Sequence, residues 1–317
     1  MAYWDSADPN APVLVIGTAG VDLIAHPEVA LQDQHRVPAR VRRAFGGVAR
    51  NVAENLARLG QPVRFVTAVG DEPAGRALLA HLEALGVDTT ASLRAADLET
   101  GHYIGLLYPQ GGLQYGIYDL RAVAALTSAY LRQHQDAFRG AAWAFVDANL
   151  SPTALRTVFA LAREHGVLMA ADATSTDLAL RLRPFLKRLT LLTLNHVEAA
   201  ALLERPISQT DFTQALEAAR ALVAQGVQLA LVTLAEFGVC YATEHTQGHI
   251  PALRTEVVDP TGAGDALTAT VIYGLLQGLL PDEAVRLGTA AAALTLRAQG
   301  TVAPDLSLET LYDELGV

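Results

Sequence analysis

Short, continuous apolar runs alternate with segments of helical periodicity along most of this 317-residue chain. Residues 13–16 are apolar at every position and lead into Gly17, as in a parallel strand that is buried on both faces. Segment 50–59 instead repeats its apolar residues at helical spacing and is followed by Gly60, a residue that commonly ends a helix. Because parallel strands need long crossover connections, this alternation predicts an open, mostly parallel sheet with helices on both faces.

Further elements follow from the same pattern. The other predicted strands lie at 63–69, 142–146, 167–171, 189–194 and 229–233, and the other predicted helices at 74–85, 152–165, 212–225, 263–277, 281–299 and 308–315. Two segments, 26–44 and 100–118, interrupt this order with extended sequence of weak alternation. We expect them to form a small flap of strands, the lid, over one edge of the sheet. The whole chain, 1–317, is therefore predicted to be a single α/β domain with the lid as an appendage.

Charge and cysteine content exclude several classes of function. Lys and Arg number 23 against 33 Asp and Glu, and no basic stripe is present that would neutralise nucleic-acid phosphates. The one local excess of arginine, at 36–50, is interpreted as a solvated or domain-edge face, with an anchor for an anionic ligand as the alternative. Cys240 is the only cysteine, so an intrachain disulfide and a Cys-rich zinc site are excluded.

The chain also lacks the marks of a membrane or exported protein. Its most apolar runs, 266–280 and 287–296, are shorter than the roughly 18–20 residues that span a bilayer. Segment 1–12 has neither the basic start nor the apolar stretch of a signal peptide. We therefore expect a cytoplasmic protein that acts on small molecules and binds neither nucleic acid nor membrane.

The segment 258–265 (VDPTGAGD) directly precedes an apolar helical run. Gly262 and Gly264 allow a tight turn and let a ligand approach the backbone amides. At a helix start such amides lack partners and attract anions. Asp265 in this place would set a general base beside a group that stabilises phosphoryl charge. The alternative is a glycine turn before a helix, with Asp265 stabilising the helix dipole.

This segment resembles the C-terminal signature of the ribokinase family, also called the PfkB carbohydrate kinases. Segment 46–60, with paired glycines and a helix ending in L-x-x-L-G, resembles the family's N-terminal signature. Residues 195–198 (NHVE) resemble its N-x-x-E motif. The three motifs keep the family's order and spacing over nearly the whole chain. The resemblance implies a ribokinase-like three-layer α/β/α fold and an ATP-dependent kinase of a sugar or nucleoside hydroxyl.

The resemblance also implies roles in phosphoryl transfer. Asp265 would take the proton of the acceptor hydroxyl, while the N–H groups of Gly262, Ala263 and Gly264 would stabilise charge on the phosphoryl group. Asn195 and Glu198 would hold the Mg²⁺ and phosphate region, largely through water. A plain helix cap is the alternative for these last two residues.

Other residues would bind the two substrates. By the resemblance, Asp22 would accept hydrogen bonds from sugar hydroxyls, with an Asx turn as the alternative. The opposite wall of the sugar site would be formed by Gly46, Gly47 and Asn51. The nucleotide would lie near Thr233, Gly238 and Thr261.

Three details of these motifs leave questions open. Ala235 replaces a glycine of the family's T-L-G-x-x-G motif, which leaves the local backbone path undecided. Asp172 sits where many members carry D-x-N-x-R, but the Asn and Arg are missing here. A monovalent cation such as K⁺ would lie near Asp259 and the backbone of Thr261 and Gly300.

A further set of residues bears on the identity of the acceptor. The arginine before Asn51, the run 147–149 (DAN) and the lid end 115–119 (YGIYD) resemble pseudouridine kinases. Asn149 would then meet the sugar or base, and Asp119 or Tyr118 would reach the base from the lid, with loop polarity and lid packing as alternatives. A ribokinase- or fructokinase-like free-sugar kinase shares the chemistry, and a non-catalytic sugar- or nucleoside-binding sensor is the alternative of another class. Exposed lid edges further suggest a homodimer through the lid.

Overall fold

A mixed sheet with the strand order β14-β13-β12-β11-β10-β9-β1-β4 forms the centre of the protein in a computed structural model, which describes residues 7–32, 36–110 and 112–316. The strands are β1 (Val13–Ile16), β4 (Val63–Val66), β9 (Trp143–Asp147), β10 (Leu168–Asp172), β11 (Leu191–Asn195), β12 (Leu229–Thr233), β13 (Val239–Ala242) and β14 (Gln247–Ile250). All neighbours from β4 to β12 are parallel, and β13 and β14 continue the sheet in antiparallel order. The predicted parallel sheet is confirmed, whereas β13 and β14 were not predicted.

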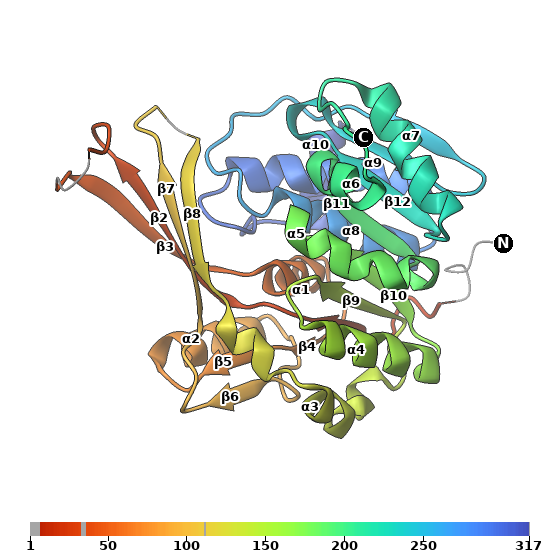
Figure 1. Cartoon of the computed structure of the whole chain (residues 1–317), viewed down its shortest axis with the longest axis horizontal. Coiled ribbons are helices and arrows are strands. Elements are labelled where there is room, and N and C mark those ends of the chain that lie inside the picture. Colours follow the sequence, from red (N-terminus) through yellow and green to blue (C-terminus); the bar gives the residue numbers. More distant parts are fainter. Residues whose placement is uncertain (1–6, 33–35, 111, 317) are drawn as a thin grey trace.

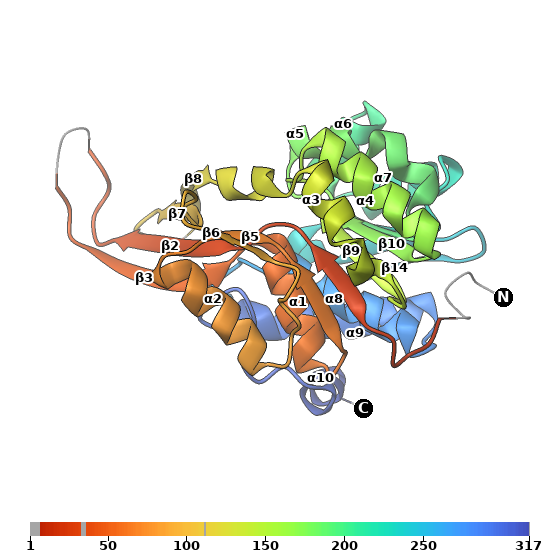
Figure 2. The same cartoon turned by 90° about the horizontal axis from the view of Figure 1, so that it is seen from below.

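Helices cover both faces of this sheet (Figures 1 and 2). One layer contains α3 (Ser128–Gln133), α4 (Pro152–His165), α5 (Thr176–Ala179), α6 (His196–Leu203) and α7 (Phe212–Ala224). The other contains α1 (Val48–Arg58), α2 (Pro73–Ala84), α8 (Ala263–Leu276), α9 (Pro281–Arg297) and α10 (Leu308–Leu315). Short 3₁₀ helices lie at Arg121–Ala125, Gln135–Phe138, Leu180–Arg188 and Ala235–Phe237. None of the described helices is long and apolar enough to span a bilayer.

The continuous apolar runs of the sequence are explained by the two helical layers. Successive side chains of a strand point to opposite faces, so Leu14 and Ile16 pack with the α4 layer while Val13 and Val15 pack with α1 and α8. All four side chains are fully buried. A strand covered on both faces therefore needs an apolar residue at every position.

The lid is a separate four-stranded sheet that projects from one end of the molecule (Figure 1). Its strands, in the order β3-β2-β7-β8, are β2 (Gly20–Pro27), β3 (Ala39–Gly46), β7 (Gly101–Leu107) and β8 (Leu113–Asp119). The predicted lid segment 26–44 began too late, because β2 already pairs with β3 and β7 from Gly20 onward. Asp22 consequently lies in a lid strand and not in a turn after β1. Beside the lid, β5 (Ala68–Gly70) and β6 (Leu93–Ala95) form a short parallel pair, so the predicted strand 63–69 is divided.

Strand register gives the lid two different faces. Asp22, Tyr103 and Tyr118 lie directly beside one another on one face, and Leu23, Ile104 and Ile117 on the other. The second face is solvent-exposed at Ile117. Pairing of two copies through the lid stays a prediction. Residues 33–35 of the first lid segment and 1–6 of the N-terminal segment lie outside the described residues.

Candidate active site

Asp265 lies in the first turn of α8, where the C-terminal signature meets α1. Its side chain is buried, with 9% of the residue exposed. The amide Nδ2 of Asn51, in the first turn of α1, donates a hydrogen bond of 2.7 Å to Asp265 Oδ2. The two sequence signatures, more than two hundred residues apart, therefore meet at one carboxylate.

The glycines before Asp265 expose the start of α8. Gly262 is the N-cap with a φ of 86°, and a Cβ on it would overlap with the carbonyl oxygen of Thr301. A Cβ on Gly264 would meet no atom within 4 Å, so the space above this turn is open. Within the described part of the chain, no side chain caps α8. Its first N–H groups are thus available to an anion that approaches over Gly264.

The carboxyl group of Asp265 is suited to accept a proton near neutral pH. Burial raises its pKa to about 7, and the charges of Asp147 and Asp22 act in the same direction. The hydrogen bond from Asn51 and the charge of Arg50 oppose this shift. A base with a pKa near the working pH is the most effective in general acid–base catalysis.

Asp22 lies against the paired glycines at the corner between β3 and α1. A Cβ on Gly46 would overlap with the Asp22 carboxylate, and a Cβ on Gly47 would lie 2.6 Å from the oxygen of Thr18. Gly47 also has a φ of 100°. The bare backbone thus lets the corner between β3 and α1 approach Asp22 closely. Burial raises the pKa of Asp22 to about 6.

Asp147 completes this corner and was not singled out as a functional residue by the sequence. Its fully buried Oδ2 accepts hydrogen bonds from the N–H (2.7 Å) and hydroxyl (2.6 Å) of Thr18 and from the N–H of Ala49 (3.3 Å). Its Oδ1 accepts the N–H of Asn149 at 3.1 Å, which holds Asn149 just beyond β9. The available signals were its place in the run 147–149 and a carboxylate that ends a buried parallel strand.

An ion pair joins the lid to the loop before α8. Arg42, on β3, contacts Asp259 Oδ2, and the N–H of Thr261 donates to Asp259 Oδ1 at 3.0 Å. Arg42 belongs to the arginine-rich segment that was interpreted as a solvated or domain-edge face, so this interaction was missed. Both oxygens of Asp259 thus have a protein partner, and a K⁺ ion beside it stays a prediction.

Asn195 and Glu198 form the cap of α6. The Asn195 Oδ1 accepts the N–H groups of Val197 and Glu198, both at 2.9 Å, and Glu198 Oε2 accepts the N–H of Asn195 at 2.8 Å. This capping box uses one polar atom of each side chain. The amide nitrogen of Asn195 and the second carboxylate oxygen of Glu198 are not part of it. A structural cap and a ligand contact are therefore compatible here.

Two mutually repelling carboxyl groups, Asp172 at the end of β10 and Glu198 in the first turn of α6, fit a cation. Burial raises the pKa of Glu198. Burial and the charges of Glu198 and Asp265 raise the pKa of Asp172. A bound Mg²⁺ would relieve this crowding. Among the described residues no group of three or more His, Cys, Asp or Glu is arranged to bind a metal, so Mg²⁺ would here depend on few protein ligands together with water and phosphate.

The loop after β12 shows which backbone path the chain takes where Ala235 replaces a glycine of the family motif. Strand register sets Thr233 beside Asn195. Ala235 has a φ of 49°, so it adopts the left-handed conformation that a glycine reaches without strain, at a cost of about 1–2 kcal/mol. Gly238 has a φ of 96°, and a Cβ on it would overlap with the oxygen of Ile250. The glycine-like backbone path is therefore kept despite the substitution.

Asp119 is not brought into the site. It lies opposite His102, on the lid face that does not carry Asp22 and Tyr103. Arg121 donates to both of its oxygens at 2.5–3.0 Å and lowers its pKa to about 2. The expected contact of Asp119 with a base is not supported, whereas Tyr118 lies on the face of Asp22.

Comparison with known proteins agrees with this geometry. The model of the pfkB family carbohydrate kinases matches residues 10–307, and the chain belongs to this family. It is similar to the pseudouridine kinase of Escherichia coli, at 28% identity with 93% of this chain and 94% of the relative covered. It is also similar to the guanosine-inosine kinase of Exiguobacterium acetylicum, at 29% identity with 89% and 93% covered.

The fold has close counterparts among solved structures. An Arabidopsis thaliana ribokinase complexed with ribose and ATP superposes with a TM-score of 0.82 at 22% identity, covering 97% of this chain and 99% of that one. The protein therefore has the ribokinase-like fold predicted from its motifs. As a member of this family it is a phosphotransferase with an alcohol group as acceptor.

We expect Gly262→Ala to be more destabilising than Gly278→Ala. Both glycines have a φ near 85°, so each alanine has the left-handed penalty of about 1–2 kcal/mol. Only the Cβ at 262 overlaps with backbone, because a Cβ at 278 meets nothing within 4 Å. Urea unfolding measures both losses of free energy. Equal losses would show that the Thr301 contact does not constrain the turn.

Asp265→Asn should raise stability, and more so at high pH. Because the pKa of Asp265 is higher in the folded state than its ordinary 3.8, the folded state binds the extra proton between about pH 4 and 7, and wild-type stability falls as pH rises through this window. The gain from the variant should be on the order of 3 kcal/mol at pH 8 and smaller at pH 4.5. Urea titrations at both pH values test this, with the exposed Asp313→Asn as control. A gain independent of pH would refute it.

Proposed function

We propose that this protein transfers the γ-phosphoryl group of ATP to a hydroxyl of a nucleoside, with Asp265 as the general base. The observation that carries the proposal is the buried carboxyl of Asp265, with a pKa of about 7, beside an open glycine turn at a helix start. This combination sets a proton acceptor next to N–H groups that attract phosphate oxygens. A simple cap for the helix dipole would need neither burial nor the open space over Gly264.

The proposed mechanism assigns a task to each part of the site. Asp22 holds hydroxyl groups of the acceptor, and Asp265 takes the proton from the hydroxyl that attacks. The N–H groups of Gly262, Ala263 and Gly264 stabilise the charge that develops on the transferring phosphoryl group. When bound, Mg²⁺ and ATP supply that group and screen its charge. Asn195, Glu198 and Asp172 are the residues that would hold the metal and phosphates.

The lid face that carries Asp22, Tyr103 and Tyr118 favours a nucleoside over a free sugar as the acceptor. Tyr103 is half-buried beside Asp22, and burial together with the charges of Asp22 and Asp259 raises the pKa of its phenol. A Cβ on Gly116 would lie 3.1 Å from Tyr103 Cε2, so the ring packs against bare backbone of β8. A flat aromatic surface beside the sugar-binding carboxylate suits a base, which gains from stacking.

Pseudouridine is the acceptor that we place first. The sequence details around Asn51 and 147–149 and the similarity to an E. coli pseudouridine kinase support it. The guanosine-inosine kinase relative supports a nucleoside more generally. Similarity to ribokinases keeps a free sugar as the second candidate.

An assay of ATP consumption over pseudouridine, uridine, guanosine, inosine, adenosine, ribose and fructose tests the proposal. We expect turnover with nucleosides, fastest with pseudouridine, and a kcat for Asp265→Asn that is about 10²–10⁴-fold lower with acceptor binding nearly kept. Asp313→Asn, an exposed carboxylate variant on α10, is the control. Turnover on free sugars alone would exclude the nucleoside, and no turnover at all would favour a binding sensor.

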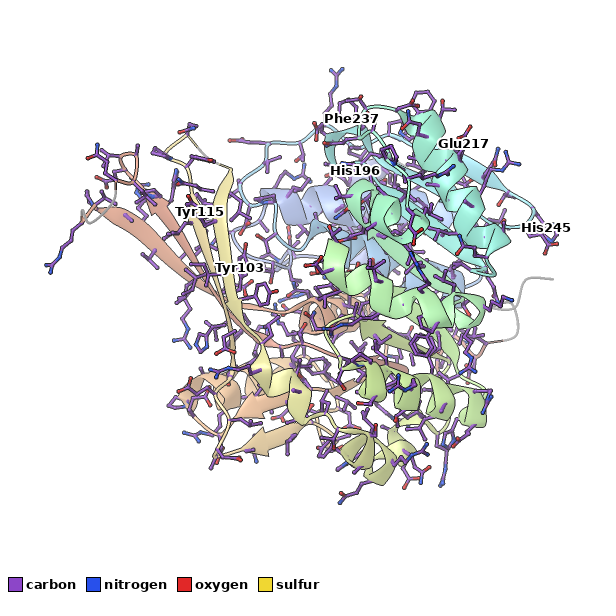
Figure 3. The ribbon with its side chains drawn as sticks, in the orientation of Figure 1. Tyr103, Tyr115, His196, Glu217, Phe237 and His245 are labelled. Atoms are coloured by element: carbon purple, nitrogen blue, oxygen red, sulfur yellow. The ribbon has the colours of Figure 1, made fainter. Side chains whose placement is uncertain are left out.

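Tyr103 offers a second test of acceptor class. Tyr103→Ala should raise KM for nucleosides about 10–100-fold by loss of stacking, and Tyr103→Phe should keep it close to wild type. Tyr115→Ala is the matched control, because Tyr115 lies on the opposite face of the same lid and is exposed (Figure 3). An equal effect of the two alanine variants would mean that Tyr103 acts only through lid stability.

A further inference from the structure

A network of buried charged side chains contacts Asn51, the residue whose amide donates a hydrogen bond to Asp265. Arg50 and Glu54, on α1, are 4% and 2% exposed. The Glu54 carboxylate contacts Arg50 Nη2, His81 Nε2 at 2.9 Å, and Arg58 Nε and Nη2 at 2.9 and 2.7 Å. Buried charges of this kind are tolerated only when they are paired, so Glu54 fixes the guanidinium of Arg50 in one place.

The other amino group of the Arg50 guanidinium contacts Asn51, which is hydrogen-bonded to Asp265. Arg50 Nη1 donates to Asn51 Oδ1 at 2.8 Å and to the carbonyl oxygen of Phe45 at 2.9 Å. The hydroxyl of Thr301 lies 2.9 Å from the same Asn51 Oδ1. A guanidinium has only donors, so it must face the oxygen of the amide and not its nitrogen.

The amide of Asn51 is thereby held in one orientation. With its oxygen turned toward Arg50 and Thr301, its nitrogen faces Asp265 and donates to the carboxylate. A flipped amide would set its N–H groups against the donors of Arg50 and its oxygen against the carboxylate oxygen. Both contacts would be repulsive in a buried site.

The charge environment gives the network a second effect. Asp265 is surrounded by Asp147, Asp22 and Asp172 from three strands and by Arg50 from α1. The positive charge of Arg50 opposes the rise in the pKa of Asp265, and its own pKa, lowered by burial to about 10, keeps it charged at neutral pH. Arg58 and His81, on the far side of Glu54, contact its carboxylate and, within the described residues, hydrogen-bond to neither Asn51 nor Asp265.

We propose that Arg50, anchored by Glu54, is a positioning residue for the phosphoryl transfer: it holds the amide of Asn51 in the orientation that donates to the general base Asp265. Arg50 does not contact Asp265 itself and acts through Asn51. The inference rests on the proposed function of Asp265, and it adds that α1 supplies the counter-charge for the base.

The test compares Arg50→Met with the double variant Arg50→Met/Glu54→Gln. The double variant also neutralises Glu54, so that this buried carboxylate is not left without the cation that Arg50 supplied. In whichever variant folds, we expect the acidic limb of the plot of kcat against pH to move to higher pH by on the order of one unit. We also expect kcat at pH 7 to fall roughly tenfold. Arg50→Lys keeps the charge and should return the limb toward the wild-type position. Arg58→Met removes a different cation from Glu54 and should lower stability without moving the limb.

A second measurement separates this inference from the proposed function. The carboxyl group of Asp265 is titrated directly by NMR on protein with ¹³C-labelled aspartate, its signal being identified with Asp265→Asn. We expect titration near pH 7 in the wild type and about one unit higher in Arg50→Met. If the wild type turns over no acceptor, the proposed function fails, while this shift still shows that Arg50 acts on the carboxyl group of Asp265. A folded Arg50→Met variant with an unmoved titration would overturn the inference, whatever the activity.

Discussion

The hydrogen bond from Asn51 to Asp265 is the interaction on which the site depends. It joins the first turns of α1 and α8, two neighbouring helices of one layer. The paired glycines beside Asp22 directly precede α1, and the open turn at Gly264 lies at the start of α8. The proposed acceptor wall, the proposed base and the N–H groups proposed to bind phosphate therefore share one junction. A shift of either helix would change all three at once.

Much of the fold could be predicted because burial on both faces leaves a direct trace in the sequence. The run that became β1 is apolar throughout, and α4 was predicted at its observed limits. The edge strand β14 carries polar residues and one buried position, so it left no such trace. The start of β2 was missed because pairing with β7, about eighty residues away, decides it.

Candidate site residues could be predicted from the sequence where the backbone conformation or the surrounding space restricts the residue type. Gly262 has no room for a side chain and Gly264 leaves the turn open, and both requirements restrict the residue type locally. The role of Asp147 depends on Thr18, 129 residues away, and has no local signature. Asp119 and Tyr118 differ by one position, and only strand register decides which of them faces Asp22. The sequence alone therefore offered both residues as contacts of the base and could not decide between them.

The ion pair between Arg42 and Asp259 links the lid to the loop before α8. Asp259 is 5% exposed, and its counter-charge comes from the lid. Any motion that lifts β3 from the loop must separate these charges. The segment leading into α8 would then lose an anchor. In the proposed mechanism, a lifted lid would therefore loosen the turn that binds the phosphoryl group, and this would disfavour wasteful hydrolysis while water can reach the nucleotide.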